Sequence, residues 1–455
     1  MDTICNCPLK TVMRNDNILL RKEKNGGVLR MVKNAKLDTL CRYGSSSVFS
    51  LKTLLKWLLL GTLVGLIVGT VGSLFAHVLA FVNGFRAQHP MVVLALPVGG
   101  LLIVFLYRFF QNTGDRGTNM VISSIHSSTE IPLRMAPLIF VSTAITHLCG
   151  GSAGREGAAI QLGGSISNYL GKIMKLTPND RRVVIMCGMS AGFSSLFGTP
   201  MAAAIFSLEV ISIGIMHYSA LVPCVTASLV GHFVAKAFRV PPEVFPVAEV
   251  PAMDPMGLLK MVVFAAAAGA VSILFCLVLH KAEHLYKKLF KNPYLRIFVA
   301  GILVIGLSFV LQTGDYLGSG MGIIEHIFHE GEASPLAFLL KMIFTAVTLG
   351  AGFKGGEIVP SFTIGAAFGC LAASILGLPV PLVAACGMAG VFCGVTNCPL
   401  TSLLIAFELF GFAGMPYYLV TVAVSYMISG NFGLYHDQRL MYSKTETRFI
   451  NSHTN

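Results

Sequence analysis

Long runs of apolar residues recur along the chain from about residue 54 to about residue 430. Glycine-rich or polar segments separate these runs, which lie for example at 58–82, 91–110, 261–279, 297–311 and 336–350. An α-helix needs roughly 20 apolar residues to cross the hydrocarbon core of a bilayer. The pattern therefore predicts an all-α polytopic membrane protein.

The composition supports this prediction. Of the 455 residues, 54% are hydrophobic and 12% are charged, whereas roughly 25% are charged in an average soluble domain. The formal net charge is +12, and many basic residues lie at the ends of apolar runs, for example Lys172, Lys175, Arg181 and Arg182. Cytoplasmic loops of membrane proteins concentrate such residues. We therefore expect a lipid bilayer, and no nucleic acid, as the partner.

Composition divides the chain into five parts. Residues 1–53 form a basic leader without the apolar core of a cleaved signal peptide, and we expect it to be cytoplasmic and disordered. Residues 54–240 and 257–430 form two membrane halves, joined by a proline-rich and acidic loop at 241–256. The C-terminal segment, 431–455, is too short for a regulatory domain.

The two membrane halves repeat one another. The separation is 201 positions from Gly117 to Gly318, 201 from Glu156 to Glu357, and 199 from Pro200 to Pro399. Three landmarks in one order at nearly one offset indicate an internal repeat. About eight helices fit in each half, and several would be too short to span a bilayer. The sequence leaves open whether the repeats are parallel or inverted.

A glutamate stands in a glycine-rich break of each half. The first break reads Gly154-Arg155-Glu156-Gly157, and the second reads Gly356-Glu357-Ile358-Val359-Pro360. A carboxylate at membrane depth is costly and usually faces a pathway or a partner. Glycine breaks at matching places in two halves point to the central binding site of a transporter.

The breaks have the features of an anion site. The N-terminus of a helix offers unpaired N–H groups and the positive end of the helix dipole, and glycine lets a ligand approach them. Segments 117–121, 154–158 and 356–360 share this pattern of a glycine followed by an apolar helix. Close helix packing is the alternative explanation for each glycine. Helix capping, or ion pairing with Arg155 or Lys354, is the alternative role for the carboxylates.

These motifs resemble those of the CLC family of anion channels and proton-coupled anion antiporters. The first glutamate break, continued by Ala158, is similar to the family motif that ends Gly-Arg-Glu-Gly-Pro, and the second is similar to Gly-x-Phe-x-Pro. Two further matches are Gly117-Thr118-Asn119-Met120-Val121, where most members have Gly-Ser-Gly-Ile-Pro, and Tyr435, which matches the pore tyrosine. The resemblance covers about residues 54–440.

The resemblance implies a CLC-type fold of two inverted repeats, whose broken helices meet at a central anion site in each subunit of a homodimer. It places Glu156 on the gating, proton-carrying glutamate. It places Thr118 and Tyr435 beside the central anion. The remaining residues that it assigns to the anion site are Gly117, Asn119, Met120, Gly154, Arg155, Gly157, Gly356, Ile358 and Val359.

Three departures from the family motifs resemble the fluoride/proton antiporters of this family. The segment after Gly117 lacks the second glycine and the proline, Glu357 adds a second carboxylate, and Val210 stands where an inner proton-transfer glutamate is expected. Two features differ from typical fluoride transporters, because Thr118 keeps the hydroxyl of chloride-selective members and Val359 replaces a frequent threonine. We assign Glu209 and Glu408 a structural, capping role.

The leading hypothesis is a proton-coupled antiporter that exports fluoride across the inner (plasma) membrane of a bacterium, with Glu156 as the gate and Glu357 as a second pore carboxylate. A chloride/proton antiporter and a passive anion channel are the alternatives. A non-transport scaffold would leave the repeat and both glutamates unexplained. We expect neither enzymatic activity, nor a metal, nor a cofactor, because the sequence has no nucleophile–base set, nucleotide loop or metal-ligand cluster.

Overall fold

We describe the fold from a computed structural model, in which the described residues are 27–112, 114, 116–127 and 130–454, with side chains from residue 51 onward. The chain forms two compact units, 1–55 and 56–455. Residues 27–53, part of the predicted leader, are helical in their backbone, whereas residues 1–26 lie outside the described residues. All candidate site residues belong to the second unit.

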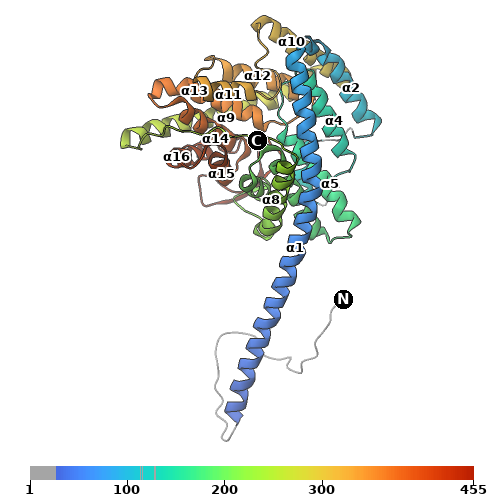
Figure 1. Ribbon diagram of the computed structural model, residues 1–455, viewed down its shortest axis with the longest axis vertical. Helices are drawn as coiled ribbons and strands as arrows, with labels where there is room; N and C mark the ends of the chain where they lie inside the picture. Colours follow the sequence, from blue (N-terminus) through green and yellow to red (C-terminus); the bar gives the residue numbers. More distant parts are fainter. Residues whose placement is uncertain (1–26, 113, 115, 128–129, 455) are drawn as a thin grey trace. The chain divides into compact units, whose positions relative to one another are not determined.

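Among the described residues, each half of the chain contains eight α-helices. The first half contains α1 (Gly27–Gln88), α2 (Leu96–Phe109), α3 (Thr118–His126), α4 (Met135–Leu148), α5 (Glu156–Ile173), α6 (Pro178–Phe197), α7 (Pro200–Glu209) and α8 (Leu221–Ala237), with 3-10 turns at Pro90–Ala95 and Tyr218–Ala220. The second half contains α9 (Pro255–Leu289), α10 (Pro293–Leu311), α11 (Met321–Glu330), α12 (Ala337–Gly350), α13 (Ile358–Leu376), α14 (Val380–Thr396), α15 (Pro399–Phe410) and α16 (Met415–Ile428). Figure 1 shows the second half, in yellow to red, beside the helices of the first half.

The helices differ widely in length. Among the described residues, six helical segments are long and apolar enough to cross a membrane: Leu51–Gln88, Pro90–Phe109, Tyr218–Ala237, Pro255–Leu289, Pro293–Leu311 and Ile358–Leu376. Six further apolar helices have 10–17 residues. Helices of this length are too short to cross a bilayer, so we expect them to end at membrane depth. Non-helical backbone at that depth is tolerated where protein surrounds it.

Matching breaks end the helices at the same place in both halves. In the first half Gly198 ends α6 with φ 79°, and Pro200 begins α7. In the second half Asn397 ends α14 with φ 59°, and Pro399 begins α15. Glycine and asparagine tolerate this left-handed conformation, and proline is well suited to the first turn of a helix.

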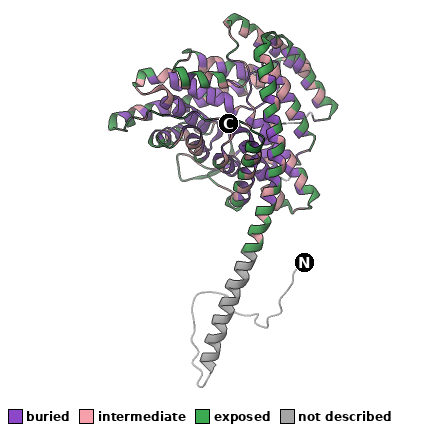
Figure 2. Cartoon of the chain, viewed as in Figure 1, coloured by how far each residue is buried: buried purple, intermediate pink, exposed green. Residues whose placement is uncertain are grey.

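Helices α5, α6, α13 and α14 form the centre of the core. An added Cβ on Gly163 of α5 would lie 2.1 Å from the carbonyl oxygen of Gly188 in α6, and an added Cβ on Gly365 of α13 would lie 2.3 Å from that of Gly387 in α14. Neither position has space for a side chain, so both helix pairs pack backbone to backbone. Figure 2 shows buried residues concentrated in the interior and exposed residues along the outer helices.

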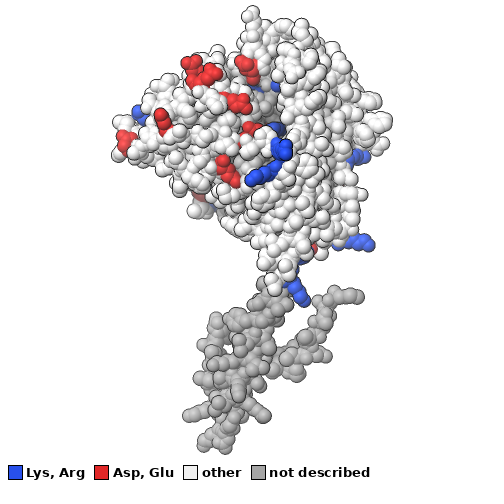
Figure 3. Space-filling model, in the orientation of Figure 1, with Lys and Arg blue, Asp and Glu red and all other residues white. Residues whose placement is uncertain are grey.

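In the part of the chain that the structure describes, a small three-stranded sheet departs from the all-α prediction. Strand β1 (Ser212–Ile213) follows α7 and pairs in parallel with β2 (Arg439–Tyr442), and β3 (Phe449–His453) pairs antiparallel with β2. The C-terminal segment thus folds back on the membrane domain. Most of the face shown in Figure 3 is uncharged, which suits contact with lipid, and acidic and basic side chains meet near its centre.

Candidate functional site

The two glutamate breaks lie against each other. The N–H group of Gly154 donates to the carbonyl of Gly356 at 2.6 Å, and the N–H group of Gly356 donates to the carbonyl of Gly154 at 2.7 Å. An added Cβ on Gly356 would lie 2.6 Å from the backbone nitrogen of Gly157. Only glycine allows this approach, and the reciprocal bridge places the N-termini of α5 and α13 side by side.

Glu156 is the first residue of α5 and is completely buried. Its Oε2 accepts a hydrogen bond from the N–H group of Arg155 at 3.1 Å, and its Oε1 lies 3.4 Å from Nε of the same arginine. Arg155 also pairs with Glu243 in the loop between the repeats. The carboxylate of Glu156 therefore occupies the N-terminus of its own helix, where an anion would be stabilised.

Glu357 precedes the first residue of α13. Its Oε2 is buried and has no hydrogen-bond partner among the described residues. A Cβ added to Gly157 would lie 3.4 Å from this oxygen and 3.4 Å from Oγ1 of Thr118. The carboxylate of the second half and the hydroxyl of the first thus both lie beside Gly157.

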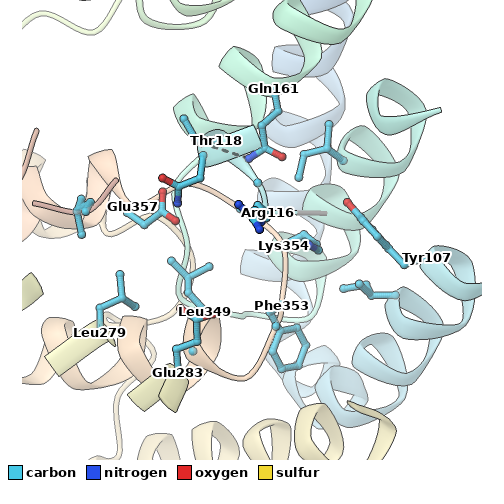
Figure 4. Close-up of a pocket in the computed structure, with 18 of the residues that line it drawn as sticks. Tyr107, Arg116, Thr118, Gln161, Leu279, Glu283, Leu349, Phe353, Lys354 and Glu357 are labelled. Carbon is cyan, nitrogen blue, oxygen red and sulfur yellow. Dashed lines mark hydrogen bonds between the residues drawn. The ribbon is translucent and has the colours of Figure 1, made fainter. Parts of the chain in front are cut away.

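Thr118 begins α3, after Gly117 with φ 62°. Its Oγ1 accepts a hydrogen bond from Nε2 of Gln161 at 3.3 Å, shown as a dashed line in Figure 4. Gln161 was not among the residues predicted for the site, although an amide in the apolar run after Glu156 was a usable signal. The oxygen of this amide is buried and has no partner in the described part of the chain.

Tyr435 approaches the site from the C-terminal segment. The side chain is buried, and its hydroxyl makes no hydrogen bond with a described residue. The phenol interacts electrostatically with both Glu357 and Glu156. Two contacts hold the segment in place: Thr454 donates to the carbonyl of Tyr435 at 2.6 Å, and the N–H group of Asp437 donates to Oδ1 of Asn119 at 3.1 Å.

Several residues that were predicted to bind the anion use their N–H groups for hydrogen bonds within the protein. Gly154 and Gly356 direct their N–H groups at each other, the N–H group of Arg155 is taken by Glu156, and the N–H group of Met120 donates to the carbonyl of Gly117. In contrast, the N–H groups of Ile358 and Val359 in the first turn of α13 have no acceptor within the helix. The open donors therefore come mainly from α13 and from the hydroxyls of Thr118 and Tyr435.

A cavity of about 730 Å³ leads to these groups. Gly117, Thr118, Asn119, Glu357 and Tyr435 line it, whereas Glu156 does not. Five cationic side chains and three carboxylates complete its charged lining: Arg108, Arg116, Lys287, Arg296 and Lys354, with Glu283, Glu357 and Asp437. Figure 4 shows Arg116, Lys354 and Glu357 around the open space. The excess of cations attracts anions to the cavity.

The carboxylates of Glu209 and Glu408 cap each other's helices. Glu209, at the end of α7, accepts from the N–H groups of Leu400 and Thr401 at 3.0 and 2.9 Å, at the start of α15. Glu408 in α15 accepts from those of Met201 and Ala202 at the start of α7, both at 2.9 Å. The predicted structural role of both residues is confirmed.

The fold and the site define a polytopic membrane protein in which broken helices of two inverted repeats meet at a central anion site. The sequence profile of the voltage gated chloride channel family matches residues 99–430. The chain belongs to this family, and its two repeats take the inverted arrangement that the resemblance implied.

Relatives and solved structures agree with this assignment. A "chloride/fluoride channel protein" of Pseudomonas syringae pv. tomato is 39% identical over 396 residues, covering 86% of this chain and 87% of that protein. The solved structure of a CLC-type fluoride/proton antiporter matches with a TM-score of 0.82 and 34% identity, covering 85% of this chain and 98% of the other. A slow cyanobacterial Cl⁻/H⁺ antiporter matches with a TM-score of 0.71 at 20% identity, covering 82% and 94%, and supports the fold alone.

Proposed function

We propose that this protein is a proton-coupled antiporter that exports fluoride from the cytoplasm in exchange for protons. The observation that carries the proposal is the meeting of two oxygens beside Gly157, since Glu357 Oε2 and Thr118 Oγ1 each lie 3.4 Å from the position of an added Cβ. The relative from Pseudomonas syringae is described as a chloride/fluoride channel protein, and the structural match as a fluoride/proton antiporter.

Glu156 is the exchanging group in this mechanism. While ionised, its carboxylate occupies the N-terminus of α5 in place of a transported anion. Protonation removes the charge and weakens the attraction to the helix N-terminus and to Arg155. The side chain then leaves, and the anion takes its place. Movement of one proton is thereby linked to movement of an anion through the same position.

Glu357 contributes a second carboxylate to the same space. Protonated, it donates a hydrogen bond to an anion; ionised, it repels one. Fluoride is small and a strong hydrogen-bond acceptor, so a protonated carboxyl group, the hydroxyls of Thr118 and Tyr435, and the N–H groups of Ile358 and Val359 would together replace its water. The cationic lining of the cavity would concentrate the anion at this site.

The hydroxyl of Thr118 favours a second candidate, a chloride/proton antiporter. The two functions differ in the anion that drives protons. We would reconstitute the purified protein in liposomes and record fluoride or chloride efflux together with external pH. Fluoride efflux coupled to opposite proton movement supports the leading proposal. Equal or faster chloride-coupled flux would favour the second candidate, and flux unable to move protons uphill would indicate a passive channel.

The variant Glu156→Gln tests the gate directly. The amide keeps the size of the side chain but carries no exchangeable charge, so we expect proton movement to fall to background. Fluoride-driven proton uptake in liposomes measures the effect. Glu325→Gln, at an exposed carboxylate of α11, is the matched control and should transport like the unchanged protein. Persistent coupled flux in Glu156→Gln would refute the assignment.

We further propose that the protein works as a homodimer in the inner membrane of a bacterium. The resemblance implies the dimer, and a relative from a bacterium supports the location. Exposed apolar side chains on α8 and α16, including Leu229, Phe233 and Leu419, provide a face for lipid or for a second subunit. The mass of the purified complex, compared with 48.6 kDa for one chain, tests the oligomeric state.

A further inference from the structure

Two histidines lie together in the wall of the cavity. His280 belongs to α9, and His436 directly follows Tyr435. Their ring centroids are 4.0 Å apart, with 31° between the ring planes. His280 also hydrogen-bonds to the backbone of Leu434. The contacts hold the pair beside the C-terminal segment that carries the pore tyrosine.

The pair lines the same cavity as the carboxylate of Glu357. His436 is exposed, His280 is half-buried, and Oε2 of Glu357 is buried in the same cavity. Glu283, which lies about one turn after His280 on α9, interacts electrostatically with both His280 and Glu357. Figure 4 shows Glu283 among the residues that line the cavity. Titratable groups therefore follow one another from the mouth of the cavity to Glu357.

A proton that reaches Glu357 needs a group to receive it on the far side. Val210, where the resemblance led us to expect a proton-transfer glutamate, is buried and apolar. Among the described residues that line the cavity, His280 and His436 carry the imidazole rings, and a neutral imidazole has a ring nitrogen that can accept a proton. The cavity volume of about 730 Å³ exceeds the roughly 30 Å³ occupied by one water molecule many times over, so water can bridge the remaining gap.

We propose that His280 and His436 form the proton-release pair of the antiporter, which passes protons from Glu357 to the cytoplasm; this inference rests on the proposed function. The O–H bond of protonated Glu357 breaks, and the proton passes through water to a neutral ring nitrogen, where an N–H bond forms. A carboxylate and an imidazolium result. The imidazolium then gives the proton to water at the mouth of the cavity and returns to the neutral state.

The surroundings favour one proton on the pair at a time. Two imidazolium rings at a centroid distance of 4.0 Å would repel each other, so the first proton makes binding of a second less favourable. The other charged groups that face the cavity are Arg108 from α2, Arg116 and Asp437 from the loops, Glu283 and Lys287 from α9, Arg296 from α10, and Lys354 and Glu357 before α13. Cations predominate among these groups, and their repulsion of the imidazolium speeds release of its proton.

The double variant His280→Gln/His436→Gln tests the pair. Glutamine retains a donor for the backbone of Leu434 but does not titrate. We expect fluoride-driven proton flux to fall about tenfold, within the range that a positioned acid–base group contributes. The dependence of flux on internal pH should also change, because the proton-accepting rings are gone. Imidazole added inside the liposomes should restore part of the flux, because a soluble base can take over the transfer. His284→Gln, an exposed histidine of α9 outside the cavity lining, is the control.

The outcomes separate this inference from the proposed function. Absence of coupled flux in the unchanged protein would overturn the proposed function, and the inference with it. Normal coupling and an unchanged pH profile in the double variant would overturn the proton-release pair alone. Slowed flux that imidazole does not restore would also overturn it, because the histidines would then act only through structure. Slowed flux restored by imidazole, with normal flux in His284→Gln, supports the proposal.

Discussion

At the scale of single residues, the site depends on glycines that lack a side chain as much as on the carboxylates beside them. Gly157 and Gly356 let two helix N-termini approach each other closely, and the same breaks place Glu156 and Glu357 at these helix ends. Glycine is required at such a position because a Cβ would occupy the space between the two helix ends.

Filling this space should block transport without unfolding the protein. In Gly157→Ala the new Cβ would lie 3.0 Å from Cα of Gly356 and 3.4 Å from both Glu357 Oε2 and Thr118 Oγ1. We expect fluoride efflux to fall by about tenfold or more, since small displacements in a positioned site have large effects. Gly306→Ala is the control, because an added Cβ there meets nothing within 4 Å. Normal efflux in Gly157→Ala would show that the anion passes elsewhere.

At the scale of helices, contacts across the repeat position the short elements. Helices α7 and α15 are too short to span a bilayer, and each has its N-terminus capped by a glutamate of the other. The bridge between Gly154 and Gly356 likewise joins equivalent places of the two halves. The two halves therefore supply acceptors for each other's unpaired backbone N–H groups at these helix ends, which lipid could not do.

Removing one of these caps should lower stability without touching the pore. Glu209→Ala leaves two buried N–H groups of α15 and the hydroxyl of Thr401 without their acceptor. We expect a loss of about 2 kcal/mol in the free energy of unfolding, and about 1 kcal/mol for Glu408→Ala, which is less buried. Thermal unfolding in detergent measures both. Glu325→Ala should leave the midpoint unchanged, and an equally neutral Glu209→Ala would contradict the capping role.

At the scale of the whole molecule, charge indicates how the protein sits in the membrane. Basic residues surround the mouth of the cavity. Helix α12 ends at Gly350, which also lines the cavity. Cytoplasmic surfaces carry the excess of lysine and arginine. The cavity should therefore open to the cytoplasm, and the segment before α12 should face the opposite side.

Side-specific labelling tests this orientation. We expect Arg116→Cys, at an exposed position of the cavity mouth, to react with a membrane-impermeant thiol reagent only from the cytoplasmic side. Glu332→Cys, exposed before α12, should react only from the outside. The free cysteines among the described residues are all buried, and the unchanged protein measures the background. The reverse labelling pattern would place the cavity on the outer face.

The sequence by itself determined the elements and the chemistry of the site. Apolar length marked the membrane helices, and Gly198 with Pro200, and Asn397 with Pro399, marked where they break. Glu156 and Glu357 could be found because a carboxylate in an apolar run is costly enough to require a purpose. Such features are local, so a few consecutive residues are sufficient to encode them.

Only the tertiary structure decided which of these features meet. It directed the N–H groups of Gly154 and Gly356 at each other's carbonyls, added Gln161 to Thr118, and placed His280 against His436 at the cavity wall. It also folded the C-terminal segment into a sheet that holds Tyr435. These contacts join residues far apart in the chain, and their geometry follows from how all the helices pack together, which the local pattern at each position does not contain.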